Sequence, residues 1–261
     1  TATCAPSGIP GRRASERMKR AQDAIIAARP YSDRMRDVLG RVSAVVGEEV
    51  HPLLARRPVR RMGLVVITTD RGLVGALNAN AIRAVLRLVA ELAEGPEAPE
   101  IELITVGRKG RDALRRSGLP IAAHFAQLGT RPAFGDVTAL TRLVVDDFLS
   151  GRYDQIDLVY SSFVSTLVQR PEVHRLLPIA SPAQESVLSH LLPHYVAVDV
   201  YRAVLENNAS EQSAQMIAMR NATDNAHELI GDLTLVYNKT RQATITREMI
   251  EIASGAEALA G

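Results

Sequence analysis

The chain has 261 residues, of which 46% are apolar and 23% are charged, and its formal net charge is +2. This composition is typical of a globular chain with one or two domains, and so small a net charge argues against nucleic-acid binding, which requires a concentrated basic surface. Cys4 is the only cysteine, which excludes an intramolecular disulfide and a cysteine zinc cluster and fits the reducing cytoplasm. No stretch approaches about 18 consecutive apolar residues, so we expect any membrane association to be indirect.

The first predicted element is a long helix from about Ala14 to His51. Pro52 is expected to end it, and Pro30 to kink it, because proline removes a backbone donor and crowds the preceding turn. Apolar side chains recur at helical spacing in its second half, at Met35, Val38, Leu39, Val42, Val45 and Val46. We expect the preceding segment, 1–13, to be unable to propagate a helix because it contains Pro6, Gly8, Pro10 and Gly11.

The middle of the chain alternates between strand and helix patterns. Short β-branched or apolar runs predict strands over 63–68, 101–106 and 156–160. Amphipathic patterns predict helices over 82–92, 111–116 and 137–150, with turns over 69–72 and 107–110. Alternation of this kind predicts a parallel, Rossmann-like α/β sheet with right-handed crossovers.

The C-terminal part is predicted to be one continuous helix from about Val196, because no proline follows Pro193. Roughly sixty helical residues would extend about 90 Å, too far to bury an apolar face against so small a domain. Spacings of four and three predict a coiled-coil seam at Ala222, Ala226, Leu229, Leu233, Val236, Thr240 and Ala243. Near Gln242 the seam changes face, to Ile245, Met249, Ile252, Ala256 and Leu259. We expect the N-terminal helix to be its antiparallel partner.

The segment 70–78 (DRGLVGALN) is the first place to seek a nucleotide site, because helix N-termini that follow parallel strands bind phosphates. Gly72 and Gly75 do not form G-x-G-x-x-G, and no G-x-x-x-x-G-K-[ST] occurs in the chain. We therefore interpret the segment as a tight connection capped by Asp70, and the basic run 107–111 (GRKGR) as a solvated turn.

A metal site is not expected either. His190 and His194 are four residues apart, but Pro193 lies between them and no third ligand is evident. No G-x-S-x-G or H-E-x-x-H pattern organises the remaining histidines, so the sequence contains no recognisable catalytic machinery and no cofactor site.

The string 210–259 (SEQSAQMIAMRNATDNAHELIGDLTLVYNKTRQATITREMIEIASGAEAL) resembles the gamma subunits of F-type ATP synthases nearly throughout. Residues 70–80 (DRGLVGALNAN) resemble the central-domain motif of that family, and 18–22 (MKRAQ) and 28–35 (ARPYSDRM) resemble the later part of its first helix. The resemblance covers the chain from about residue 17 to its end, and a chance match across some fifty positions is negligible.

The resemblance implies an α/β protein in which an antiparallel coiled coil of the N- and C-terminal helices joins a central Rossmann-like domain. The corresponding expected boundaries are 14–55 for the first helix, 60–182 for the α/β domain and 183–261 for the C-terminal helical region, with 1–13 atypical. Family members usually begin with a longer basic helix, whereas this chain begins TATCAPSGIPGRR, so we expect a misassigned or frameshifted start of the gene.

The resemblance also implies a non-catalytic rotor subunit that couples proton-driven rotation to ATP synthesis and contributes to regulating ATPase activity and proton flow. The implied partners are the alpha and beta subunits around the coiled coil, and the epsilon subunit and the c-ring at its foot. The implied location is the cytoplasmic face of a bacterial plasma membrane, with the membrane contacted only indirectly. A bacterial source is favoured because the cysteine pair of redox-regulated plastid relatives is missing.

By resemblance, Arg241, Gln242, Thr246 and Glu248 match family positions at the contact with the beta subunits, where polar groups form and break hydrogen bonds as the shaft turns. Glu211 matches a position linked to coupling. Gln215 stands where the family usually carries arginine, so an ion pair with that arginine cannot form. The alternative interpretation is that these residues are solvated polar faces of a long helix.

Two other classes of protein remain open from the residues alone. An enzyme would need a Rossmann nucleotide site, against which the missing phosphate fingerprint argues. A static coiled-coil scaffold would share the helices but leave the polar C-terminal motif without a reason.

Overall fold

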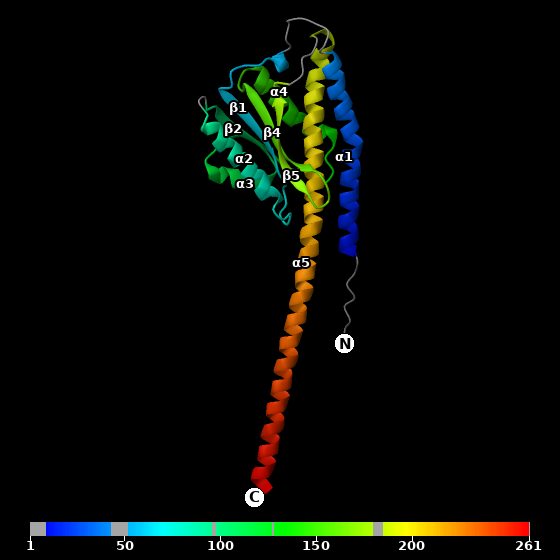
Figure 1. The fold of residues 1–261 in the computed structure, drawn as a ribbon, viewed down its shortest axis with the longest axis vertical. Coiled ribbons are helices and arrows are strands. Elements are labelled where there is room, and N and C mark those ends of the chain that lie inside the picture. The colour runs from blue at the N-terminus through cyan, green and yellow to red at the C-terminus, as the bar shows by residue number, and fades with distance from the viewer. Residues whose placement is uncertain (1–8, 43–51, 96–97, 127, 180–184, 261) are drawn as a thin grey trace. The chain divides into compact units, whose positions relative to one another are not determined.

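The computed structural model describes residues 9–42, 52–95, 98–126, 128–179 and 185–260. The chain divides into two compact units, Thr1–Ile217 and Ala218–Gly261. The first unit holds a mixed α/β domain, drawn in Figure 1, and the second consists of the C-terminal part of one long helix.

The centre of the first unit is a five-stranded sheet with the strand order β3-β2-β1-β4-β5. Its strands are β1 (Arg61–Ile67), β2 (Glu100–Val106), β3 (Ile121–Phe125), β4 (Gln155–Phe163) and β5 (Gln169–Leu177). The pairs β1–β2, β1–β4 and β2–β3 are parallel, and β4–β5 is antiparallel. The register aligns Val65 of β1 with Ile104 on one side and Leu158 on the other.

The sheet confirms three predicted strands and corrects the prediction of an all-parallel sheet. Strands β1, β2 and β4 lie where the β-branched runs predict them, whereas β3 and β5 were not predicted. β3 is short and contains two alanines, and β5 carries Pro171 and is exposed over most of its length. Both are edge strands, and edge positions tolerate proline and weak β-formers because one side of the strand needs no partner.

Alternating side chains of the strands face two different helical layers. Met62, Leu64 and Val66 of β1 pack with α2 (Leu77–Ala93) and α3 (Arg108–Leu114), as do residues of β2 and β4. Val65 and Ile67 face the opposite layer, which contains α4 (Thr138–Leu149) and the beginning of α5 (Glu185–Ala260). Strands buried on both faces explain why these runs are apolar throughout rather than alternating.

Helix α5 begins earlier than predicted and passes through Pro193. A proline inside a helix costs on the order of 3 kcal/mol because it loses a backbone hydrogen bond. Leu192 and Val196 on either side of it are fully buried in the core of the α/β domain. Burial of these side chains offsets that cost, so the first turns of α5 belong to the core of the α/β domain.

Helix α1 spans Ile9–Val42 and also begins earlier than predicted. The expectation that Pro10 and Gly11 cannot belong to a helix was wrong, because both stand in its first turn. A proline is tolerated there, since the first backbone N–H groups of a helix have no intrahelical acceptor. The predicted continuation to His51, with Val45 and Val46, lies outside the described residues.

In the first unit, α1 and α5 lie side by side and run in opposite directions. Ile25 of α1 is buried against Leu205 and Ala209 of α5. Further along α1, the hydroxyl of Tyr31 lies 3.2 Å from Nε2 of His194. The residue numbers fall along α5 as they rise along α1, so this stretch is antiparallel.

Glu206 of α5 joins three elements through one carboxylate that is 1% exposed. Oε2 accepts hydrogen bonds from the backbone N–H of Phe163 at 3.0 Å and the hydroxyl of Ser162 at 3.1 Å, both on β4. Oε1 accepts from the guanidinium of Arg29 on α1 at 3.2 and 3.3 Å, and lies 3.5 Å from Nε of Arg202. Several charged partners are what a carboxylate requires to be buried at all.

The turn between β2 and α3 depends on two glycines that approach Thr68. Gly107 has φ 93°, and a Cβ there would overlap the backbone carbonyl of Thr68. A Cβ on Gly110 would lie 2.7 Å from Cγ2 of the same threonine. The run 107–111 was expected to be a solvated turn, but it is the beginning of α3, held against β1.

We predict that Gly107→Ala lowers the free energy of unfolding of the first unit by about 3 kcal/mol, because it combines a left-handed backbone with a steric overlap. Gly118→Ala is the matched control, since Gly118 has φ 79° but open space around its Cβ position. The control should cost only about 1–2 kcal/mol. Urea unfolding followed by circular dichroism measures both, as the chain has no tryptophan. Equal losses in the two variants would refute the steric argument.

We also predict that Glu206→Ala destabilises the first unit by about 3–5 kcal/mol, because it leaves buried donors without their acceptor. Arg29→Ala removes only one partner, whose side chain is 41% exposed, and should cost about 1 kcal/mol. The same unfolding experiment compares them. A Glu206→Ala loss no larger than that of Arg29→Ala would show that the carboxylate is not the centre of this junction.

Candidate functional site

The carboxyl ends of β1 and β2 meet at one edge of the sheet, and the loops that follow them surround a small cavity. It has a volume of about 180 Å³ and is called here the inner cavity. The loops after β1, β2 and β3 and one face of α5 line it, through residues that include Thr68, Asp70, Arg71, Gly107, Arg108, Thr130, Asn207, Asn208 and Glu211. This edge is where ligands bind in many open α/β sheets.

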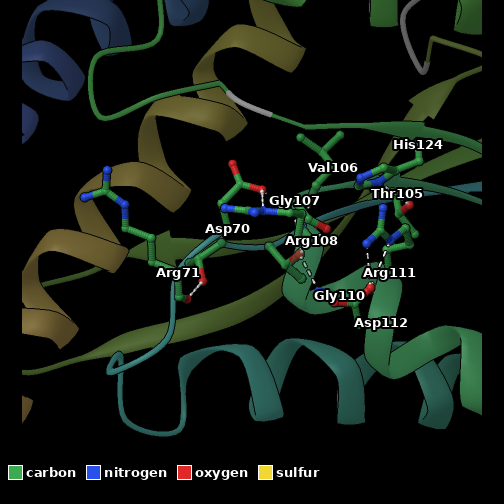
Figure 2. A network of polar contacts seen from close by, with 12 residues as sticks. Asp70, Arg71, Thr105, Val106, Gly107, Arg108, Gly110, Arg111, Asp112 and His124 are labelled. Atoms are coloured by element: carbon green, nitrogen blue, oxygen red, sulfur yellow. Dashed lines mark hydrogen bonds and ion pairs between the residues drawn. The ribbon is translucent and has the colours of Figure 1, made fainter.

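The first turn of α3 faces this edge, and its backbone donors are already satisfied (Figure 2). The N–H of Arg108 donates to Oδ1 of Asp70 at 3.0 Å, and that of Lys109 to the carbonyl of Thr69 at 3.1 Å. The N–H of Gly110 donates to Oγ1 of Thr68 at 3.0 Å. A phosphate at a helix N-terminus needs these same donors. The end of β1 therefore occupies the position that a phosphate would take.

Asp70 caps α3, the helix that follows the neighbouring strand β2. It was expected to cap the connection 70–78, whereas its carboxylate accepts a hydrogen bond from the first N–H of α3 and lies 3.5 Å from Nε of Arg108. The N-cap of α2 is Ala76, which makes no side-chain cap. Asn78 instead ties the start of α2 to β1, by donating to Oγ1 of Thr69 at 2.8 Å and accepting from its N–H at 3.2 Å.

The loop between β1 and α2 also contacts α5. Val74 and Leu77 are buried with Ala214 of α5 in a small apolar cluster. This contact brings Arg71 and Glu211 to the same cavity. Burial raises the pKa of Glu211 to about 7, the positive charge of Arg71 opposes the shift, and the negative charge of Asp70 adds to it.

The structure separates the five residues that the sequence resemblance selects. Glu211 lies in the first unit and lines the inner cavity. Arg241, Gln242, Thr246 and Glu248 lie in the second unit, on an exposed part of α5. Arg241 and Glu248 are seven residues apart and share one helical face, and Gln242 and Thr246 are four apart and share another.

Of the two histidines considered as metal ligands, only His194 has a described side chain. His194 lies beside the rings of Tyr31 and Phe134, with ring centroids 6.4 and 5.6 Å away. The side chain of His190 lies outside the described residues. No group of three potential metal ligands occurs among the described side chains.

Sequence reasoning missed Glu206, Asn207 and the role of Thr68. Glu206 and Asn207 follow a helical apolar stripe and read as ordinary polar helix positions. The role of Thr68 is signalled in the sequence only by Gly107 and Gly110, three residues apart. Two such glycines indicate that another segment approaches the backbone closely, but they do not identify that segment.

Comparison with known proteins identifies the family. A family model described as ATP synthase matches residues 14–259. The ATP synthase gamma chain of Roseiflexus sp. (strain RS-1) is 47% identical over 94% of this chain and 90% of its own length. That of Dehalococcoides mccartyi (strain ATCC BAA-2100 / JCM 16839 / KCTC 5957 / BAV1) is 44% identical over 95% and 90%.

The chain belongs to the ATP synthase gamma chain family. Two solved structures share the fold of this gamma chain. One is a chain from the Euglena gracilis mitochondrial ATP synthase (OSCP/F1/c-ring), with a TM-score of 0.62 and 20% identity over 95% of this chain and 94% of that one. The other is from the Tetrahymena thermophila central stalk/c-ring, with a TM-score of 0.54 and 23% identity over 78% and 99%. Among the described residues of the gamma chain, no helix is long and apolar enough to cross a membrane.

We predict that the stability of this gamma chain falls as pH rises from about 4.5 to about 7, through the titration of Glu211. The folded chain holds the proton more tightly than the unfolded chain does, because the folded pKa of Glu211 is raised to about 7. Glu211→Gln should therefore match the unsubstituted chain at pH 4.5 and exceed it by on the order of 2 kcal/mol at pH 8.

Urea unfolding at the two pH values measures this difference. Glu228→Gln, at an exposed position of the same helix, is the control and should change neither value. A Glu211→Gln chain that gains nothing at pH 8 would contradict a buried, costly carboxylate at this cavity.

Proposed function

We propose that this gamma chain is the central-stalk rotor of an F-type ATP synthase, which couples proton-driven rotation to ATP synthesis by the alpha and beta subunits. Membership in the family supports the proposal. The observation that carries it is the surface of α5 in the second unit, where large apolar side chains remain exposed along the helix.

These side chains repeat over almost the whole described length of the second unit. Their exposed fractions range from 43% for Ile245 to 72% for Ile252. The set is Met219, Leu229, Ile230, Leu233, Leu235, Val236, Tyr237, Ile245, Met249, Ile250 and Ile252. Apolar surface of this extent marks an interaction site, because leaving it in water forgoes about 25 cal/mol per Å².

The N-terminal helix is proposed to pair with α5 as an antiparallel coiled coil within the first unit, where Ile25 is buried against Leu205 and Ala209. The predicted seam residues Leu229, Leu233 and Val236, which are 58–61% exposed, are proposed to face the catalytic ring. The proposed domain boundaries remain 14–55 for the N-terminal helix, 60–182 for the α/β domain and 183–261 for the C-terminal helical region.

Rotation can change the catalytic sites only if the shaft contacts each beta subunit differently. A ligand or a shaft shifts an equilibrium between conformations by the difference in its interaction free energy with them. A single helix with distinct faces provides that difference, because its seam changes face near Gln242. The asymmetric shaft thereby drives the catalytic sites through successive states without an active site of its own.

Arg241, Gln242, Thr246 and Glu248 are proposed to make the polar contacts with the beta subunits. All four are exposed on the described helix, which leaves their side chains available to a partner. Hydrogen bonds at such positions break and reform without the large cost of desolvating a buried charge. Glu211 is proposed to contribute to coupling from the first unit, at the inner cavity.

The epsilon subunit and the c-ring are proposed to bind the α/β domain. The gamma chain would then lie peripherally at the cytoplasmic face of a bacterial plasma membrane and would contribute to regulating ATPase activity and proton flow. The Euglena and Tetrahymena structures, both of assemblies that include the c-ring, support a place in such an assembly.

We predict that replacing Arg241, Gln242, Thr246 and Glu248 together by alanine lowers ATP synthesis in reconstituted vesicles while leaving assembly of the complex intact. Each lost hydrogen bond is worth about 0.5–1.5 kcal/mol, so the rate should fall at least about tenfold. ATP synthesis driven by a proton gradient and gel filtration of the complex measure the two properties.

The control is Asp232→Ala with Arg247→Ala, which removes one acid and one arginine from exposed positions of the same helix that are not three or four residues from any of the four. This pair should retain most of the synthesis rate. An equal loss in both variants would contradict face-specific contacts. A gamma chain that does not co-elute with alpha and beta subunits would refute the rotor proposal and favour a static scaffold.

A further inference from the structure

A second, larger cavity adjoins the inner cavity in the first unit. It has a volume of about 990 Å³ and is called here the outer cavity. One face of α1, the loop 129–132 and the side of α5 around Tyr201, Leu205 and Asn208 line it. The two cavities share five lining residues: Arg71, Gly129, Thr130, Pro132 and Asn208. A volume of this order accommodates a small organic ligand.

The outer cavity is strongly basic. Four arginines from three separate elements line it: Arg17 and Arg20 of α1, Arg71 of the β1–α2 loop and Arg131 of the loop after β3. Glu16 is the single carboxylate among its lining residues. None of the four guanidinium groups makes a salt bridge or side-chain hydrogen bond with another described residue. Guanidinium groups bind phosphate oxygens in bidentate geometry, so this set matches a phosphate-bearing ligand.

The inner cavity supplies hydrogen-bonding groups next to these charges. The side chain of Asn207 is 5% exposed, lines the inner cavity and forms no hydrogen bond with another described side chain. The polar atoms of this amide are not shut off from solvent, so they are available to hydrogen-bond a ligand in place of water. Nδ2 of Asn208 reaches the carbonyl of Gly129 only at 3.5 Å. Amides offer both a donor and an acceptor, as hydroxyl groups of a ligand require.

From this arrangement we propose that the two cavities form one binding site for a small phosphate-bearing anion, with its phosphates among Arg17, Arg20, Arg71 and Arg131 and its organic part against Asn207. The site does not use the N-terminus of α3, whose donors are satisfied by Asp70 and Thr68 of the segment that follows β1. In Figure 2 the side chain of Arg71 extends away from Arg108 and Asp70, and Arg71 is one of the residues that line both cavities. The site does not involve the exposed surface of the second unit, but its inner part is also lined by Glu211, which is proposed to contribute to coupling.

Isothermal titration calorimetry of the full-length chain with ADP and with pyrophosphate, both without divalent cations, tests the proposal. Arg20→Gln with Arg71→Gln should weaken both ligands at least about tenfold. Arg87→Gln with Arg115→Gln removes the same charge from exposed positions outside the cavities and should change neither by more than about twofold. Circular dichroism checks that each variant is folded.

Two single variants separate the contributions of the cavities. Asn207→Ala should weaken ADP but not pyrophosphate, because only ADP carries an organic part. Glu16→Gln should strengthen both ligands, a gain that misfolding cannot produce. If pyrophosphate binds as tightly as ADP and Asn207→Ala affects neither, the arginines form a site for free phosphate or pyrophosphate, and the role assigned to Asn207 is wrong.

Three outcomes overturn the proposal. The first is no binding of either ligand at about 1 mM, the concentration that half-fills a site whose binding free energy is about −4 kcal/mol. The second is an equal effect of the two double arginine variants, which would indicate only general surface charge. The third is tighter binding of a hexaglutamate peptide than of ADP, which would assign the cavity to an acidic segment of a partner protein.

Discussion

The buried carboxylate of Glu206 holds together the part of the molecule on which the rest depends. It accepts hydrogen bonds from Ser162 and Phe163 at the end of β4 and from the guanidinium of Arg29 on α1. Its low exposure makes these contacts costly to break, because an unpaired charge would remain in the interior. The orientation of α1 along α5 in the first unit, and with it the outer cavity between them, follows from this junction.

The same domain shows how an α/β sheet can keep its architecture without the usual phosphate site. In a dinucleotide-binding domain, a glycine-rich turn leaves the first N–H groups of a helix open to a phosphate. Here Thr68, Thr69 and Asp70 at the end of β1 take those donors, and Gly107 allows α3 to approach closely enough for them to do so. The glycines therefore serve packing between two elements rather than ligand binding.

The two units of the gamma chain bury their side chains differently. In the first unit, the beginning of α5 is part of the core, and Leu192, Val196 and Val200 are fully buried. In the second unit, the same helix exposes its large apolar side chains. The first part of this helix is therefore stabilised by burial within its own chain. The second part leaves apolar side chains exposed to contact other subunits, as expected for a member of a multisubunit assembly.

The sequence alone predicted the elements whose patterns are local. The β-branched runs of β1, β2 and β4, the amphipathic helices and the long C-terminal helix are visible because their side-chain period is set by backbone geometry. The family was also identifiable from the residues, since the string 210–259 is long and specific. The position of Glu211 could be named in this way, but its environment beside Arg71 could not.

Only the tertiary structure decided what depends on contacts between distant residues. Edge strands β3 and β5 carry weak local signals, and the pairing of β5 with β4 determines that it is antiparallel. Pro193 stays within α5 because the surrounding side chains are buried against the sheet, and Asp70 caps α3 because β1 and β2 are neighbours. Arginines that are 51 to 111 positions apart, Arg20, Arg71 and Arg131, line one cavity only after folding. Local periodicity encodes the elements, whereas the free energy of burial and charge pairing between them determines the site.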